Sequence, residues 1–149
     1  MQSKIIISES SENTKLIAKK IAKNIKQKRV ISLEGNLGSG KTTFIQGFAK
    51  ALGIKEKIKS PTFVIMKKYK IPLKANKNVD KYSYIYHFDC YRIQSTKEIV
   101  TLGWEKIIQD QKNIILVEWG DKIKSILPKD KIYINFKFKK ENIRQITIL

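Results

Sequence analysis

Apolar and polar positions in the N-terminal part of the chain alternate between strand-like and helix-like patterns. Ile5–Ser8 and Val30–Glu34 are short apolar runs typical of strands. Between them, residues 12–27 predict a helix whose apolar side chains share one face, at Leu16, Ile17, Ile21 and Ile25. Lys41–Leu52 predicts a second helix, which ends at Gly53.

The pattern becomes richer in strands after Pro61. Thr62–Ile71 is a run of strand-forming residues, and Lys81–Tyr91 alternates aromatic and polar side chains. A polar connection separates the two runs, which predicts an antiparallel pair. Ser95–Gln109 then predicts a helix with a break at Gly103, and Asn113–Trp119 a buried strand.

The end of the chain predicts a short helix followed by a hairpin. Asp121–Leu127 is the helical segment, because Pro128 ends it. Lys131–Lys139 and Ile143–Leu149 are the two strands, with a turn at residues 141–142. Strand–helix units combined with hairpins favour a three-layer α/β/α fold with a mixed central sheet. A length of 149 residues predicts a single domain over residues 1–149.

Composition excludes several classes of protein. Hydrophobic residues make up 42% of the chain, which argues against disorder, and no apolar run approaches the about 18 residues of a membrane span. The apolar stretch near the N-terminus is too short for a signal peptide. We therefore expect a cytoplasmic protein with no membrane partner. Because Cys90 and His87 are the only residues of their types, an internal disulfide is excluded and a transition-metal centre is disfavoured.

The net charge of +18 comes almost entirely from lysine. The chain has 31 basic residues against 13 acidic ones, and its only arginines are Arg29, Arg92 and Arg144. Nucleic-acid recognition often uses the planar arginine side chain, so the lysine excess has two open explanations, an AT-rich coding bias and a functional role. With either explanation, the positive field attracts RNA and other polyanions non-specifically.

The strongest chemical signal is the segment GNLGSGKT at residues 35–42. It matches G-x-x-x-x-G-K-[ST] between a predicted strand and a predicted helix. Glycines allow backbone N–H groups to surround a phosphate without Cβ clashes, and the helix N-terminus favours the same negative charge. Lys41 is expected to reach the β- and γ-phosphates, and the Thr42 hydroxyl to ligate Mg²⁺. This P-loop predicts a nucleotide site.

Two acidic residues are candidates to assist the P-loop. Glu118 ends the apolar run IILVE and Asp89 ends the run IYHFD. Ligands of open α/β sheets bind at the carboxyl ends of strands, so these acids are expected to orient a metal ion or a water molecule. A solvent-facing Glu118 and a buried or capping Asp89 remain alternatives. His87 is expected to pack or hydrogen-bond structurally, and Trp119 either to stack on a base or partner or to join the core.

The sequence narrows the class of nucleotide-binding protein. A GTPase is disfavoured because the chain lacks D-x-x-G, and residues 76–80 hold one residue too many for N-K-x-D. A stand-alone P-loop kinase of a small metabolite remains an alternative, although three scattered arginines argue against its usual arginine-rich lid. A non-enzymatic RNA-binding module with a structural nucleotide is a third possibility, supported by the lysine excess alone.

Four spaced motifs resemble one known family. They are GNLGSGKTT at residues 35–43, SPTF at 60–63, HFDCYR at 87–92 and VEW at 117–119, with a Leu102-Gly103 step between the last two. Their order is similar to that of the bacterial tRNA threonylcarbamoyladenosine biosynthesis ATPases, the TsaE (YjeE) family, over almost the whole chain. The resemblance implies a P-loop NTPase fold.

The resemblance also implies a function. Proteins of this family are small ATPases required for N6-threonylcarbamoylation of adenosine 37 in tRNAs that read ANN codons. They act with the TsaD and TsaB proteins, so contact with tRNA is expected to be indirect. A weak Mg²⁺-dependent ATPase, stimulated by these partners and using ATP and Mg²⁺, is the activity that follows.

Family resemblance also assigns roles to individual residues. Ser11 and Glu12 are expected near the adenine, Thr62 as a nucleotide sensor in a switch segment, and Trp119 near the nucleotide or partner. The implied catalytic residues are Lys41, Asp89 and Glu118, and the implied metal ligands are Thr42, Glu118 and Asp89. The implied nucleotide-binding residues are Ser11, Glu12, Asn36, Leu37, Gly38, Ser39, Gly40, Lys41, Thr42, Thr43, Thr62 and Arg144.

Two features depart from the family pattern. Asn36 stands where the family usually has Asp, and an amide cannot act as a base or pair with a cation as a carboxylate does. The segment Pro72–Lys81 is longer and more basic than usual, which fits either a solvated hairpin tip or a contact with tRNA or a partner.

Overall fold

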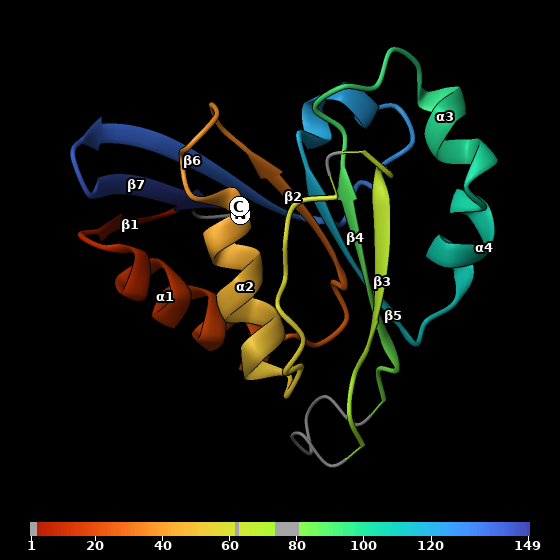
Figure 1. Ribbon diagram of the computed structural model, residues 1–149, viewed down its shortest axis with the longest axis horizontal. Helices are drawn as coiled ribbons and strands as arrows, with labels where there is room; N and C mark the ends of the chain where they lie inside the picture. The colour runs from red at the N-terminus through yellow and green to blue at the C-terminus, as the bar shows by residue number, and fades with distance from the viewer. Residues whose placement is uncertain (1–2, 62, 74–80) are drawn as a thin grey trace.

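A mixed seven-stranded sheet forms the centre of the protein (Figure 1). The computed structural model describes residues 3–61, 63–73 and 81–149. The strand order is β1-β7-β6-β2-β5-β4-β3. The strands are β1 (Lys4–Ser8), β2 (Val30–Glu34), β3 (Met66–Lys70), β4 (Tyr84–Asp89), β5 (Asn113–Glu118), β6 (Ile132–Lys140) and β7 (Ile143–Ile148). Strands β6, β2, β5 and β4 run parallel, and β1, β7 and β3 pair antiparallel with their neighbours.

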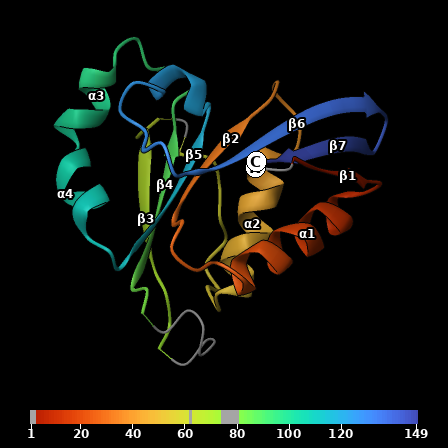
Figure 2. The same cartoon turned by 180° about the vertical axis from the view of Figure 1, so that it is seen from behind.

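Helices cover both faces of the sheet, which confirms the predicted three-layer α/β/α architecture. The helical elements are α1 (Ser11–Lys23), α2 (Lys41–Ala51), α3 (Thr96–Thr101), α4 (Trp104–Gln109) and the 3₁₀ turn η1 (Gly120–Ile123). Helices α1 and α2 pack on one face, whereas α3 and α4 lie beside β3, β4 and β5 at the other end of the sheet (Figure 2).

Strand alternation divides the apolar side chains between two cores. Ile31, Ile85 and Leu116 belong to the core under α1 and α2, whereas Val117 and Phe88 belong to the core under α3 and α4. Odd positions of β4 and even positions of β5 therefore face α2, because successive strand residues point to opposite faces. Asp89 and Glu118 are register partners at the carboxyl ends of these two strands. Both ends lie at the same edge as the start of α2.

Capping residues explain where the helices begin and break. The Ser10 hydroxyl accepts a hydrogen bond from the Asn13 amide at 3.0 Å and starts α1. Ser95 and Glu98 form a capping box at the start of α3. The predicted break in this helical segment is confirmed, since Gly103 is left-handed and separates α3 from α4.

Four local predictions were wrong, and the first two concern α1. Helix α1 ends at Lys23 because the Asn24 side chain bonds the Lys20 carbonyl, and Leu16 is 55% exposed rather than part of the buried face. The packed face of α1 instead carries Thr14, Ile17, Ala18 and Ala22, and Leu16 lies about 100° around the helix from Ile17.

The other differences concern turns. The expected helix at Asp121–Leu127 is only η1, because Trp119 is left-handed and the following amides bond three residues back. Strand β3 begins at Met66, since the amides of Val64 and Ile65 bond the Pro61 carbonyl in a turn. The predicted antiparallel pairing of β3 with β4 is confirmed. Within the described residues, no helix has the length and hydropathy of a membrane span.

Candidate functional site

The glycine-rich loop occupies the position that the sequence predicts, between the end of β2 at Glu34 and the start of α2 at Lys41. Its first residue, Gly35, has φ = 136°, and a Cβ there would approach the Phe136 carbonyl oxygen to 2.4 Å. Only glycine fits this position, because backbone from β6 blocks the space that a side chain needs. Gly35 thus packs the beginning of the loop against β6, and the end of the loop leads into α2.

Lys41 is a buried cation inside this loop. Its side chain is 4% exposed, and Nζ donates to the carbonyl oxygens of Gly35 at 2.5 Å and Asn36 at 3.0 Å. The ammonium group lies 4.3 Å from the centre of the Trp119 ring. Burial lowers the pKa of Lys41, and the carboxylates of Glu118 and Asp89 oppose that shift. A partly desolvated ammonium beside a helix N-terminus is suited to bind an anion.

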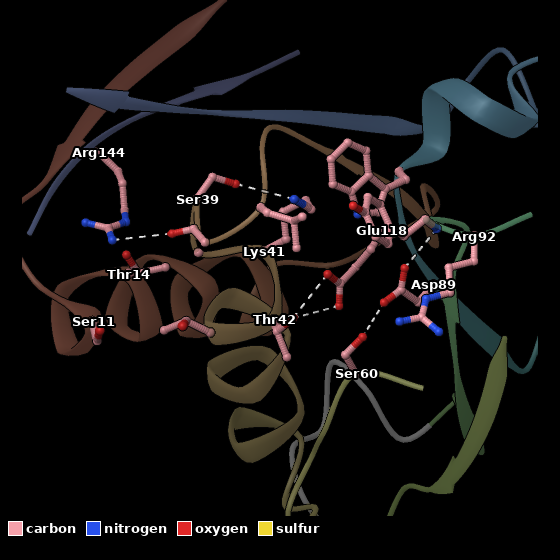
Figure 3. Close-up of a pocket in the computed structure, with 16 residues that line it drawn as sticks. Ser11, Thr14, Ser39, Lys41, Thr42, Ser60, Asp89, Arg92, Glu118 and Arg144 are labelled. Atoms are coloured by element: carbon pink, nitrogen blue, oxygen red, sulfur yellow. Dashed lines mark hydrogen bonds between the residues drawn. The ribbon is translucent and has the colours of Figure 1, made fainter. Parts of the chain in front are cut away.

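Thr42 and Glu118 face each other across the site (Figure 3). The Thr42 hydroxyl lies 3.0 Å and 3.1 Å from the two carboxylate oxygens of Glu118. Glu118 is 3% exposed, and its Oε1 also lies 2.8 Å from Nε2 of the fully buried His87. His87 was expected to pack or hydrogen-bond structurally. Its hydrogen-bond partner is Glu118, the candidate metal-binding acid.

Asp89 is the second carboxylate at this edge of the sheet. It accepts a hydrogen bond from the Ser60 hydroxyl, and its Oδ1 accepts one from the Tyr91 amide at 3.0 Å. Figure 3 shows Ser60 and Asp89 directed toward each other next to Glu118. Ser60 belongs to the segment expected to act as a switch, so that segment contacts the acidic side of the site.

A cavity of about 530 Å³ joins these groups. Arg144 lies at its opposite end, where its guanidinium donates to the Gly38 carbonyl oxygen at 3.4 Å (Figure 3). The lining residues are Ser11, Thr14, Leu37, Gly38, Ser39, Gly40, Lys41, Thr42, Thr43, Ser60, Asp89, Tyr91, Arg92, Glu118, Trp119 and Arg144.

Most described residues expected to bind nucleotide line this one cavity, but Glu12 and Asn36 are not among its lining residues. Glu12 lies outside the lining, and its carboxylate pairs with Lys15 at 2.7 Å. The contact of Asn36 with the site is made by its backbone carbonyl, which accepts from Lys41. Thr62 lies outside the described residues, as does most of the Pro72–Lys81 segment.

The structure adds Thr14 and Tyr91 to the site. Thr14 follows Ser11 by three residues and so shares its helix face, a spacing that could have identified it. The Tyr91 ring packs against Trp119 with centroids 5.0 Å apart, a contact that no local pattern encodes. Arg92 lines the same cavity, and its guanidinium lies 5.6 Å from the Phe63 ring.

The donor set is compatible with Mg²⁺. Thr42 and Glu118 bring hydroxyl and carboxylate oxygens together, and Asp89 adds a carboxylate at the end of the neighbouring strand. Mg²⁺ prefers oxygen ligands and is commonly held by one or two carboxylates together with phosphate oxygens. No group of three or more His, Cys, Asp or Glu side chains suited to a metal occurs in the described residues, so an all-protein metal cage is not seen there.

Comparison with known proteins identifies the family of this chain. The family model "Threonylcarbamoyl adenosine biosynthesis protein TsaE" matches residues 8–146. The Bacillus subtilis tRNA threonylcarbamoyladenosine biosynthesis protein TsaE is 40% identical over 91% of this chain and 78% of its own length. Its Rickettsia typhi counterpart is 39% identical over 93% of this chain and 90% of its own length.

A solved structure shows the same fold. The crystal structure of Bacillus subtilis YdiB aligns with 99% of this chain and 84% of its own, with a TM-score of 0.73 and 34% identity. The family model spans all four sequence motifs, from before the P-loop to the last strand. The chain therefore belongs to the TsaE family of threonylcarbamoyladenosine biosynthesis proteins.

Proposed function

We propose that this protein is a Mg²⁺-dependent ATPase that acts with TsaD and TsaB in N6-threonylcarbamoylation of adenosine 37 in tRNAs reading ANN codons. A role in tRNA threonylcarbamoyladenosine biosynthesis follows from the family, and the relatives carry that role in their names. The observation that supports hydrolysis most strongly is the contact between the Thr42 hydroxyl and the Glu118 carboxylate at the start of α2.

Each side chain of the site has a distinct task in this proposal. The P-loop amides and Lys41 bind the β- and γ-phosphates, and Lys41 balances negative charge as the terminal phosphate leaves. Thr42, Glu118 and Asp89 would hold Mg²⁺, which, when bound, neutralises phosphate charge. In this proposal Asp89 also orients the attacking water. Ser11, Thr14 and Arg144 line the opposite end of the cavity, and we assign the adenosine moiety to that end.

Substitution of Glu118 tests the metal-binding assignment. Glu118→Gln keeps the shape of the side chain but removes its negative charge and replaces one acceptor oxygen with a donor NH₂ group. We expect ATP hydrolysis in the presence of the TsaD–TsaB pair to fall by about 10²-fold or more, as when a charged transition-state contact is lost. Normal hydrolysis by E118Q with its partners would contradict the assignment.

A matched control separates this loss from general damage. Glu105→Gln makes the same chemical change on α4, away from the cavity, and should leave hydrolysis unchanged. The alternative of a metabolite kinase makes a different prediction. ADP formation would then depend on an added small-molecule acceptor rather than on the partner proteins.

A further inference from the structure

His87 is a buried polar residue of β4, between Ile85 and Asp89 on the strand face that points toward α2. It is 0% exposed and faces α2 together with Ile85, opposite Leu116 of β5. An aliphatic side chain would suit this position, because burying an imidazole costs free energy unless its nitrogens are bonded. Among the described residues Nδ1 has no hydrogen-bond partner, so the contact of Nε2 with Glu118 is the one that accounts for a histidine here.

His87 and Thr42 both contact the carboxylate of Glu118. Nε2 of His87 lies 2.8 Å from Oε1, and the Thr42 hydroxyl lies 3.0 Å and 3.1 Å from the two carboxylate oxygens. A carboxylate accepts only, so the His87 proton is assigned to Nε2. Two donors from different elements thus hold the carboxylate, and His87 contacts only Oε1, so Oε2 is left to the side of Thr42.

We propose that His87 is a positioning residue, which holds the Glu118 carboxylate in the orientation needed to bind Mg²⁺ beside Thr42. The inference rests on the proposed function and deepens it. His87 does not contact the cavity itself, since it is absent from the lining residues. Its effect on Mg²⁺ therefore passes through Glu118, in the manner of outer-shell partners that orient metal ligands.

The test is the effect of Mg²⁺ on ATP affinity, measured by calorimetry with Mg²⁺ and with a chelator in its place. The dissociation constant of ATP with the chelator, divided by the one with Mg²⁺, measures how strongly the metal favours ATP binding. This ratio does not require turnover. His87→Leu removes the donor, and we expect the ratio to fall by about tenfold. His87→Gln carries an N–H at about the reach of Nε2 and should keep the ratio close to wild type. The shorter side chain of His87→Asn does not reach Glu118, so the ratio should fall as it does in His87→Leu.

A stability control distinguishes positioning from packing. Ile85→Val creates a small cavity in the same strand and on the same face, so it lowers the melting temperature without touching Glu118. Its Mg²⁺ coupling should equal that of the wild type. Loss of coupling in I85V, or equal coupling in H87N and H87Q, would overturn the inference even if H87L does not fold.

The wild-type result separates failure of this inference from failure of the proposed function. Equal ATP affinity with and without Mg²⁺ in the wild type would contradict both the magnesium role of Glu118 and the role of His87. Strong coupling in the wild type that persists in H87L would overturn the His87 inference alone and leave the ATPase proposal standing.

Discussion

Glu118 shows how a single residue joins the fold to its chemistry. The side chain is 3% exposed, yet it is placed where a bound phosphate would bring more negative charge. Burying a carboxylate costs on the order of several kcal/mol unless partners compensate. Here the Thr42 hydroxyl, the His87 ring and the buried ammonium of Lys41 provide that compensation. Groups of the protein itself therefore hold the Glu118 carboxylate in place.

Cys90 illustrates the opposite case, a residue that the fold makes unreactive. It is fully buried, and burial raises its pKa to about 12, with Asp89 adding to the shift. We expect iodoacetamide to leave the native protein unlabelled at pH 8, because the reactive thiolate is scarce and inaccessible. Mass spectrometry before and after unfolding in guanidinium measures this, and rapid labelling of the native protein would contradict it.

At the scale of elements, the close packing of α1 against α2 fixes the position of the P-loop, because the loop leads directly into α2. A Cβ on Gly47 of α2 would lie 2.5 Å from Cα and 2.7 Å from the carbonyl oxygen of Lys15 on α1. The two helices therefore pack backbone to backbone at this point. Since α2 begins at Lys41, any displacement of the helix also moves the glycine-rich loop that precedes it.

Replacing Gly47 tests this packing. Alanine in a helix interior usually stabilises by about 1 kcal/mol relative to glycine. Here the clash with the Lys15 backbone should outweigh that gain and lower the free energy of unfolding by about 1–3 kcal/mol. Chemical denaturation measures the change, with Lys50→Ala on the exposed side of α2 as the control. A stabilised G47A would show that the helices are not in close contact.

Local elements could be predicted from the sequence far better than their long-range arrangement. The P-loop between a strand and a helix, the β3–β4 pair and the Gly103 break all follow from local residue patterns. The insertion of β6 beside β2 and the pairing of β1 with β7 do not, because several strand orders bury the same faces. The bond from His87 to Glu118 depends on that order, since it requires β4 beside β5.

At the scale of the whole molecule, charge is the dominant feature. A net charge of +18, carried mostly by lysine, predicts binding to any polyanion at low salt. We expect tRNA affinity to fall by about tenfold or more between roughly 50 and 200 mM salt. Fluorescence anisotropy with labelled tRNA measures this, with poly-U as the control. Tight tRNA binding that resists salt and is not shared by poly-U would instead indicate a dedicated RNA surface.

The central claim is that ATP turnover by this chain is coupled to its partners. The most direct measurement is ATP hydrolysis with Mg²⁺ by the purified protein, alone and with the TsaD–TsaB pair from the same source. We predict slow hydrolysis alone and a clear rise with the pair, which would also show that Asn36 is compatible with catalysis. ATP binding without any rise, persisting after Asn36→Asp, would contradict the claim.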